Sequence, residues 1–461
     1  MSGEVKMSLP TEALDSGSAE ERATFGLFSV TADERLLTEG VDTTNQKLSH
    51  GPHVSGYPLA EWIAWNFWRL RWEFVRPTAE DGACRWDFAH RMSTIGDGYL
   101  WPDLSVFSDG LQCFLVSAPS RSPDSLLFRY LGASRRPEVV PAKNLEEAID
   151  GFVEDILIRF EDRKLSDTNL HRLWKDLATE RATPELARFR RLEAQLGCDP
   201  DEADEHVIRR HLAATATLGE DAMGELATDS AIHGSGPDGM MSADTIESFA
   251  MRSGFDANPN DAVALDDAED VPRMGETMAA WRVGVRTARA LRTRERMDGE
   301  PICDTRLADF AGTTAGAISD TNRCSERISF LLHQESENIR LSLRSKWETG
   351  RRFDLARLIG DRLLRHRACL PAERLHPATR ARSSYRQKMQ RAFAAELLCP
   401  FASMDDMLRG DCSEESQSAV VEHFNVSPWT IGTQLVNHHR IDREDAPGIV
   451  GHDAHEAGTG A

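Results

Sequence analysis

The chain has 461 residues, of which 40% are hydrophobic and 28% charged, and its formal net charge is -21 at pH 7. This length fits two or three domains, because a domain typically has about 100–200 residues. The negative charge argues against nonspecific nucleic-acid binding by the whole molecule, and no apolar stretch approaches the roughly 20 residues that span a bilayer.

The N-terminal segment, residues 1–56, is rich in Ser, Thr, Gly, Asp and Glu. We predict a flexible lead with one strand at 24–30, because such a composition buries little apolar surface. The segment has no apolar run after a basic region, which is the layout of a secretory signal. We therefore expect a cytoplasmic protein that does not associate with membranes. The eight cysteines are scattered and form no C-x-x-C pair, which predicts reduced thiols, not a zinc cluster or a disulfide framework.

Residues 57–145 open with a Trp-rich stretch at 58–72, which we predict to be an amphipathic helix. Its tryptophans recur every three or four residues: Trp62, Trp65, Trp68 and Trp72. We expect this stripe to form the core of an α+β module. The alternatives are an aromatic platform for bases, a membrane-surface helix or a groove for a partner.

Two β-rich runs then flank the pair Asp109-Gly110, which predicts a hairpin over 104–116, because this pair accepts the positive φ of a tight turn. A helical extension follows at 146–215. Its apolar residues have helical spacing in three segments: 145–157, 169–177 and 184–196.

Residues 216–275 are predicted to be an acidic linker. Between positions 212 and 272 the chain has thirteen Asp and Glu residues and a single basic residue, Arg252. This charge density disfavours a packed core. We expect at most one short helix there, at 242–251.

The last third of the chain is basic, with fourteen Lys and Arg against four acidic residues between 344 and 391. Residues 351–361 read Arg-Arg-Phe-Asp-Leu-Ala-Arg-Leu-Ile-Gly-Asp, and residues 393–400 read Phe-Ala-Ala-Glu-Leu-Leu-Cys-Pro. The apolar run 339–343 precedes the first phrase and predicts a strand. Helices are predicted at 277–296, 352–367, 385–398 and 414–424.

These phrases and their order resemble the ImmA/IrrE family of zinc metallopeptidases over residues 276–442. The resemblance implies a mostly helical zincin-like domain, in which His-Glu-x-x-His binds zinc and activates water. The chain departs from that motif: Arg357 and Asp361 replace the two histidines, and Leu358 replaces the catalytic Glu. The acidic ligand expected between 387 and 392 is also missing. An Arg repels a dication and a Leu accepts no proton, so we expect no catalytic residues, no metal and no cofactor.

A displaced metal site would have to use His366, His376 or Glu373, whose spacing does not reproduce a ligand pair on one helix face. Residues 418–441 are similar to the helix-turn-helix-like tail of the family. The recognition helix of this tail would be 428–437, which has no Arg or Lys, so we expect it to pack within the fold and not to read DNA.

The fold class expected from these observations is α+β. It comprises the Trp-rich module, the helical extension, the acidic linker, the zincin-like domain and a disordered tail at 443–461. The resemblance implies a regulatory protein that keeps a binding surface for a partner, such as a transcriptional repressor in a stress, phage or mobile-element circuit. The arginines offered to this partner would be Arg351, Arg352, Arg357, Arg362 and Arg365.

Two other functions remain open. One is an active metallopeptidase with a rebuilt or unrecognised metal site. The other, which the net charge disfavours, is a nucleic-acid-associated protein that uses the Arg-rich face.

Overall fold

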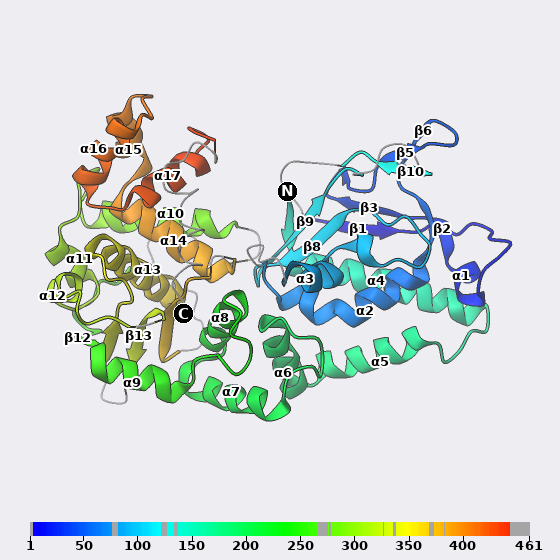
Figure 1. The fold of residues 1–461 in the computed structure, drawn as a ribbon, viewed down its shortest axis with the longest axis horizontal. Coiled ribbons are helices and arrows are strands. Elements are labelled where there is room, and N and C mark those ends of the chain that lie inside the picture. The colour runs from blue at the N-terminus through cyan, green and yellow to red at the C-terminus, as the bar shows by residue number, and fades with distance from the viewer. Residues whose placement is uncertain are drawn as a thin grey trace.

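The computed structural model describes residues 3–75, 82–120, 127–132, 137–265, 275, 278–325, 327–334, 338–367, 373–381 and 383–442. Figure 1 shows an N-terminal body coloured blue to cyan and a C-terminal body coloured yellow to red, with green helices running between them. The mixed α+β class is confirmed. The predicted tail at 443–461 lies outside the described residues. Within the described ranges, no helix combines the length and apolar character needed to cross a membrane.

Short antiparallel strands fill the segment predicted to be a flexible lead, so that prediction is wrong. The strands are β1 (Val5–Ser8), β2 (Phe25–Leu27), β3 (Ser29–Ala32), β4 (Arg35–Leu36), β5 (Gly40–Asp42), β6 (Lys47–Ser49) and β7 (His53–Ser55). They pair in the orders β1-β3-β4 and β2-β7, and β5 lies between β6 and β10 (Phe128–Tyr130). Phe28, Val30 and Leu37 are buried in the core of this body. Strands of two to four residues are too short to show a clear alternating pattern in the sequence.

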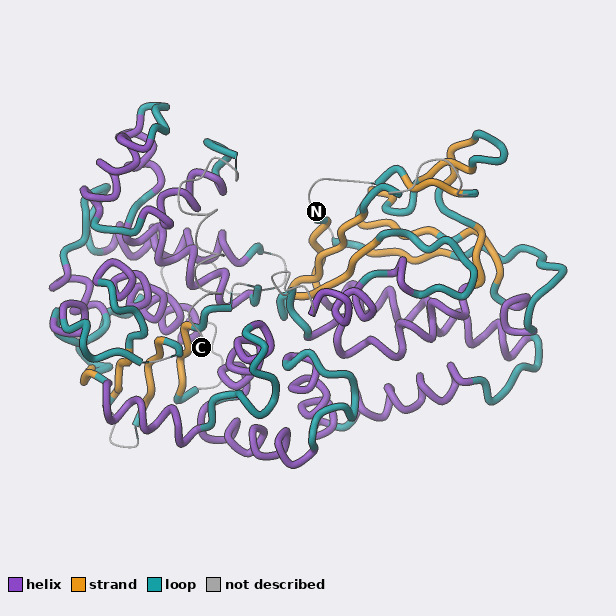
Figure 2. Tube along the Cα trace, viewed as in Figure 1, coloured by secondary structure: helices purple, strands orange, loops and turns teal. Residues whose placement is uncertain are grey.

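The predicted hairpin is confirmed as β8 (Leu104–Ser108) and β9 (Gln112–Ser117), with β11 (Glu138–Pro141) on the other side of β9. Gly110 has φ +103°, which explains the glycine in the turn. As Figure 2 shows, helices pack below these sheets. They are α2 (Gly56–Trp72) and α4 (Ala142–Asp162), with α1 (Ala19–Ala23), α3 (Gly82–His90), the 3₁₀ helix η1 (Met92–Thr94), α5 (Asn169–Ala182) and α6 (Pro184–Gln195) around them.

The tryptophans of α2 do not form a single buried face. Trp68 lies in the core, Trp62 and Trp72 are partly buried, and Trp65 is 56% exposed. The helix contacts α3, α4, α5, α6 and β8 on several sides. These neighbouring elements determine which indole rings are buried, and they leave the ring of Trp65 exposed to solvent.

Residues 216–265 of the segment predicted to be an acidic linker form a packed helical layer, so that prediction is wrong there; residues 266–274 lie outside the described residues. The layer contains all of α8 (Glu220–Ile232) and α9 (Ala243–Ser253), which follow α7 (Glu205–Leu218). Only the expected short helix, found as α9, is confirmed. Met223, Leu226 and Phe249 join Phe330 and Leu375 of the C-terminal sheet in one core. These helices therefore cover one face of that sheet.

The C-terminal sheet is antiparallel, in the order β12-β14-β13-β15. Its strands are β12 (Phe255–Ala257), β13 (Ser329–His333), β14 (Ile339–Ser342) and β15 (Leu375–Ala378). Helix α13 (Glu348–Arg367) contacts β13 and β15, and its apolar residues share a core with Leu331 and Leu341 of the sheet. The other helices are α10 (Ala280–Arg294), α11 (Asp304–Phe310), α12 (Gly316–Ser319), α14 (Tyr385–Leu398), α15 (Phe401–Leu408), α16 (Glu414–Phe424) and α17 (Pro428–Asn437). The four helices predicted for this region are thus present.

The turn of the β8–β9 hairpin contacts the N-terminus of α14. The amide of Tyr385 donates to the carbonyl of Asp109 at 2.8 Å, and Nζ of Lys388 lies 2.9 Å from an Asp109 carboxylate oxygen. Leu111 packs against a small apolar cluster that contains Tyr385 and Met389. The two bodies therefore meet beside α14.

Candidate functional site

Helix α13 places Arg357 and Asp361 one turn apart on the face that looks toward α14. The opposite positions are apolar and buried, among them Leu355, Leu358 and Ile359. This is the periodicity of a helix with one side in the core. Leu358 has no exposed surface, so the position of the motif's Glu points into the hydrophobic core.

Arg357 is buried and binds the segment where the family's third ligand was expected. Its guanidinium donates to Oε1 of Gln387 and, at 3.4 Å, to Oε1 of Gln390. It also donates to the Thr379 carbonyl at 2.7 Å and to Asp354 at 3.2 Å. Both glutamines in turn donate to the Pro377 carbonyl. Burial lowers the pKa of Arg357 from its ordinary value, an effect that Asp354 opposes.

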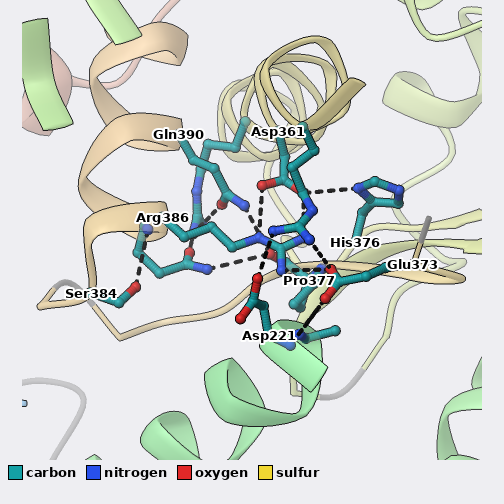
Figure 3. A network of polar contacts seen from close by, with 12 residues as sticks. Asp221, Asp361, Glu373, His376, Pro377, Ser384, Arg386 and Gln390 are labelled. Carbon is teal, nitrogen blue, oxygen red and sulfur yellow. Dashed lines mark hydrogen bonds and ion pairs between the residues drawn. The ribbon is translucent and has the colours of Figure 1, made fainter. Parts of the chain in front are cut away.

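Asp361 forms a buried ion pair with Arg386 of α14 and a hydrogen bond with His376 of β15 (Figure 3). Nε and Nη2 of Arg386 donate to the two carboxylate oxygens at 2.8 Å and 2.6 Å, and Nδ1 of His376 lies at 2.9 Å. Burial disfavours both charges. The ion pair nevertheless raises the pKa of Arg386 and, with the histidine contact, holds the pKa of Asp361 well below its ordinary value.

Glu373 links this ion pair to α8. Its Oε2 lies 3.0 Å from Nη1 of Arg386 and 3.2 Å from Nη2 of Arg365. Its Oε1 accepts from the amides of Asp221 and Ala222 at 3.0 Å and 3.2 Å. These amides belong to the first turn of α8, where a carboxylate is stabilised by the helix dipole and by unsatisfied N–H groups.

Glu225, one turn further along α8, lies buried beside the same arginine. Burial raises its pKa to about 7, although Arg386 and hydrogen bonds with Ser384 and Gln387 act in the opposite direction. Its Oε2 has no hydrogen-bond partner among the described residues. This carboxyl group therefore holds its proton over a wider range of acidic pH than an exposed glutamate and loses it around neutral pH.

These residues form what we call the buried ion-pair network. Its members come from α8, α13, the segment just before β15, β15 itself and α14: Asp221, Glu225, Arg357, Asp361, Arg365, Glu373, His376, Arg386, Gln387 and Gln390. The sequence indicated Arg357 and Asp361 as a pair of positions on α13. It gave no sign of Arg386 or Glu225, because Glu225 lies in the segment predicted to be a linker and Arg386 in a stretch that reads as a basic surface.

The five arginines expected to bind a partner are not a surface patch. Four of them are buried, and Arg362 is partly buried. Arg351 donates to the carbonyls of Ala317 and Arg323, and Arg352 to the Ile302 carbonyl and to Asp304. Arg362 donates to the Val263 and Phe310 carbonyls, and Arg365 pairs with Asp221 and Glu373. These five arginines therefore do not offer a partner-binding face, because their donors are used inside the fold.

The residues considered for a displaced metal site are only partly brought together. His376 and Glu373 each contact a residue of the network, but the side chain of His366 lies outside the described residues. Among the side chains that the structure describes, no three His, Cys, Asp or Glu residues are grouped as metal ligands. His376 and Glu373 instead make the contacts of an ion-pair network.

The helix-turn-helix-like segment packs within the C-terminal body. Ile431 and Leu435 of α17 are buried, and Gln434 donates to the Cys399 carbonyl at 2.9 Å. The inward face of α17 is therefore occupied by its own fold, as expected from the absence of Arg and Lys.

Comparisons with known proteins add no relative. No protein-family model, no curated protein and no solved structure matches this chain. The geometry of the buried ion-pair network is therefore the main basis for proposing a function.

Proposed function

We propose that the chain is a non-catalytic regulatory protein, in which a degenerate ImmA/IrrE-like domain binds a protein partner such as a transcriptional repressor. One observation carries this proposal. Arg357 and Asp361, which we compare with the zinc-binding histidines of the family, are both engaged in contacts with α14.

The chemistry of these contacts argues against hydrolysis at this place. Zinc needs ligands with free lone pairs, and a guanidinium has none and remains charged. Asp361 has lone pairs, but Arg386 and His376 occupy its two oxygens. A water at this place would also find no base at position 358, because Leu358 cannot accept a proton.

A partner must use other parts of the surface, because the expected arginines are internal. Two large aromatic side chains of the C-terminal body are exposed, Trp347 by 78% and Trp281 by 51%. Trp281 lies beside Arg282, whose guanidinium is 5.2 Å from the indole centroid. Tryptophan and arginine are enriched among the residues that dominate binding energy at protein interfaces.

The test has two parts. First, the purified chain is measured for zinc by elemental analysis and incubated with each helix-turn-helix repressor of its host, with cleavage followed by mass spectrometry. Second, the same repressors are screened for direct binding to the wild-type chain and to a Trp281→Ala, Trp347→Ala variant. We expect no stoichiometric zinc, no cleavage, and binding of at least one repressor that the variant weakens. Zinc-dependent cleavage, or no binding to any repressor, would overturn the proposal.

A further inference from the structure

Helix α10 presents a basic face to solvent. Its opposite side packs against α14 (Figure 1), and Val283 and Leu291 on that side are buried. A Cβ added to Gly284 would lie 2.3 Å from the Met389 carbonyl oxygen, so the two helix backbones approach closely there. This close packing holds α10 in one orientation and thereby fixes the direction in which its exposed side chains point.

Three arginines lie along the exposed side of α10. Arg282, Arg286 and Arg289 are spaced by four and three residues, which places them on one face over about 10 Å of helix. Among the described side chains, no carboxylate forms an ion pair with Arg282 or Arg286. Arg289 pairs with the buried Glu396 at 2.7 Å, but its own side chain is still 56% exposed. At least two of the three guanidinium groups are therefore open to an incoming carboxylate.

The charge of this face stays positive when its neighbours are counted. Burial lowers the pKa of His438, and Arg289 and Arg440 lower it further, so these residues lie close together. Arg440 pairs with Asp405 at 2.6 Å. The three arginines of the face, Arg440 and the two paired carboxylates leave a net charge of +2, with His438 neutral near pH 7. The charged residues at and beyond the C-terminal end of α10 cancel one another: Arg294, Glu295, Arg296, Asp298, Glu300 and Arg306.

An apolar edge runs beside the arginines. Trp281 and Val285 are four residues apart and form the row next to Arg282 and Arg286. Trp281 is 51% exposed and Val285 is half-buried. The Arg282 guanidinium lies 5.2 Å from the centroid of the Trp281 ring. Rows of side chains spaced by four residues are the ridges that pack into the grooves of another helix.

We propose that this face of α10 binds an acidic amphipathic helix of a partner protein. Carboxylates spaced by three and four residues along that helix meet Arg282 and Arg286, and its apolar stripe covers Trp281 and Val285. The net charge of -21 repels a nucleic-acid backbone from the chain as a whole, whereas one short acidic helix meets the local positive charge. This assignment rests on the proposed function, because it specifies the element of the partner protein that is bound.

The experiment titrates the full chain with a fluorescein-labelled helical peptide of about five turns, which carries glutamates at this spacing beside a leucine stripe. A matched peptide has glutamine in place of every glutamate, and a DNA duplex of similar length is the nucleic-acid probe. Fluorescence anisotropy should show saturable binding of the acidic peptide, at least about tenfold tighter than that of the glutamine peptide and weaker at high salt. Arg282→Glu combined with Arg286→Glu should weaken this binding by about tenfold or more, because two attractive contacts become repulsive.

Lys175→Glu combined with Arg210→Glu is the matched control, because it changes the net charge equally at exposed positions of α5 and α7. Its affinity for the acidic peptide should equal that of the wild type. The proposal is overturned if the acidic peptide does not bind saturably, if the glutamine peptide or the DNA duplex binds as tightly, or if the two double variants behave alike.

The chain also has an acidic segment of its own before α10, residues 266–274, which lies outside the described residues. A variant with Asp266→Asn, Asp267→Asn, Glu269→Gln and Asp270→Asn tests whether this segment takes the place of the partner helix. Unchanged affinity for the acidic peptide supports the proposal, and affinity raised by about tenfold or more would overturn it.

Failure of this assignment can be told apart from failure of the proposed function. A repressor that binds the chain equally well after Arg282→Glu with Arg286→Glu overturns the docking face and leaves the proposed function standing. Binding of the acidic peptide without binding of any repressor supports the docking face and overturns the proposed function.

Discussion

Asp361 on α13 accepts two hydrogen bonds from the guanidinium of Arg386 on α14, at 2.8 Å and 2.6 Å. Both side chains are buried, and the two residues are 25 positions apart in the sequence. The ion pair joins two helices of the C-terminal body at the place where we propose that a metal site has been lost. Loss of this ion pair should therefore destabilise the C-terminal body.

Replacing Asp361 by Asn should lower the free energy of unfolding by about 3 kcal/mol or more, because it leaves a buried guanidinium short of compensating charge. Urea unfolding monitored by circular dichroism measures the loss. Asp405→Asn is the control, since Asp405 forms a 2.6 Å pair with Arg440 at the surface. Exposed pairs contribute about 0–1 kcal/mol. Equal losses in the two variants would contradict a special role for the Asp361 pair.

Glu225 should make stability depend on pH. Its pKa is about 7 in the folded chain, against an ordinary value of 4.5. A raised pKa means that the folded state holds the proton more tightly, so the contribution to stability is complete below pH 4.5 and is lost as the pH rises through 7. The difference corresponds to about 3 kcal/mol.

Glu225→Gln mimics the protonated group and should remove this loss. Relative to the wild type, the variant should become progressively more stable between pH 4.5 and 7, with a constant advantage above. Thermal or urea unfolding at a series of pH values measures this difference in stability between the variant and the wild type. Glu34→Gln, at an exposed position, should follow the wild type at every pH. A constant difference between Glu225→Gln and the wild type from pH 4 to 8 would show that Glu225 is not protonated in the fold.

Gly219 and Gly151 should respond in opposite ways to replacement by Ala. Gly219 has φ +112°, and an added Cβ would lie 2.4 Å from the side chain of Glu373, which caps α8. We expect the change to cost about 1–3 kcal/mol of stability. Gly151 lies inside α4 with nothing within 4 Å of the added Cβ. There the change should stabilise by about 0.5–1 kcal/mol, because Ala is the better helix former. Unfolding curves that shift in the same direction for both variants would refute this account.

The contact between the two bodies depends on Asp109. Asp109→Asn can keep the hydrogen bonds inside the turn, to the amides of Leu111 and Gln112, but it loses the charge that pairs with Lys388. We expect a weaker contact, seen as faster hydrogen exchange at the N-terminus of α14 with little change inside the hairpin. Asp15→Asn, at an exposed position away from this contact, should leave the exchange unchanged. Unaltered exchange at α14 in Asp109→Asn would mean that the ion pair does not hold the bodies together.

The sequence by itself determined the elements whose signals are local. The ranges 385–398 and 414–424 were predicted as helices and are observed with these bounds, since each has a serine at its N-cap and helical spacing of apolar residues. The turn at Asp109-Gly110 could also be predicted from the sequence, because a positive φ at Gly110 is a property of the turn itself.

Only the tertiary structure decided where the charged residues lie. The sequence around Glu225 reads as an acidic linker, and the arginines of α13 read as a basic stretch that could bind a partner. Both are buried, because Glu225 lies against Arg386 and because Arg365 reaches Asp221, partners that are distant in the chain. A charge enters a protein interior only when a partner compensates its desolvation. That partner is supplied by the fold, so composition along the chain cannot reveal it.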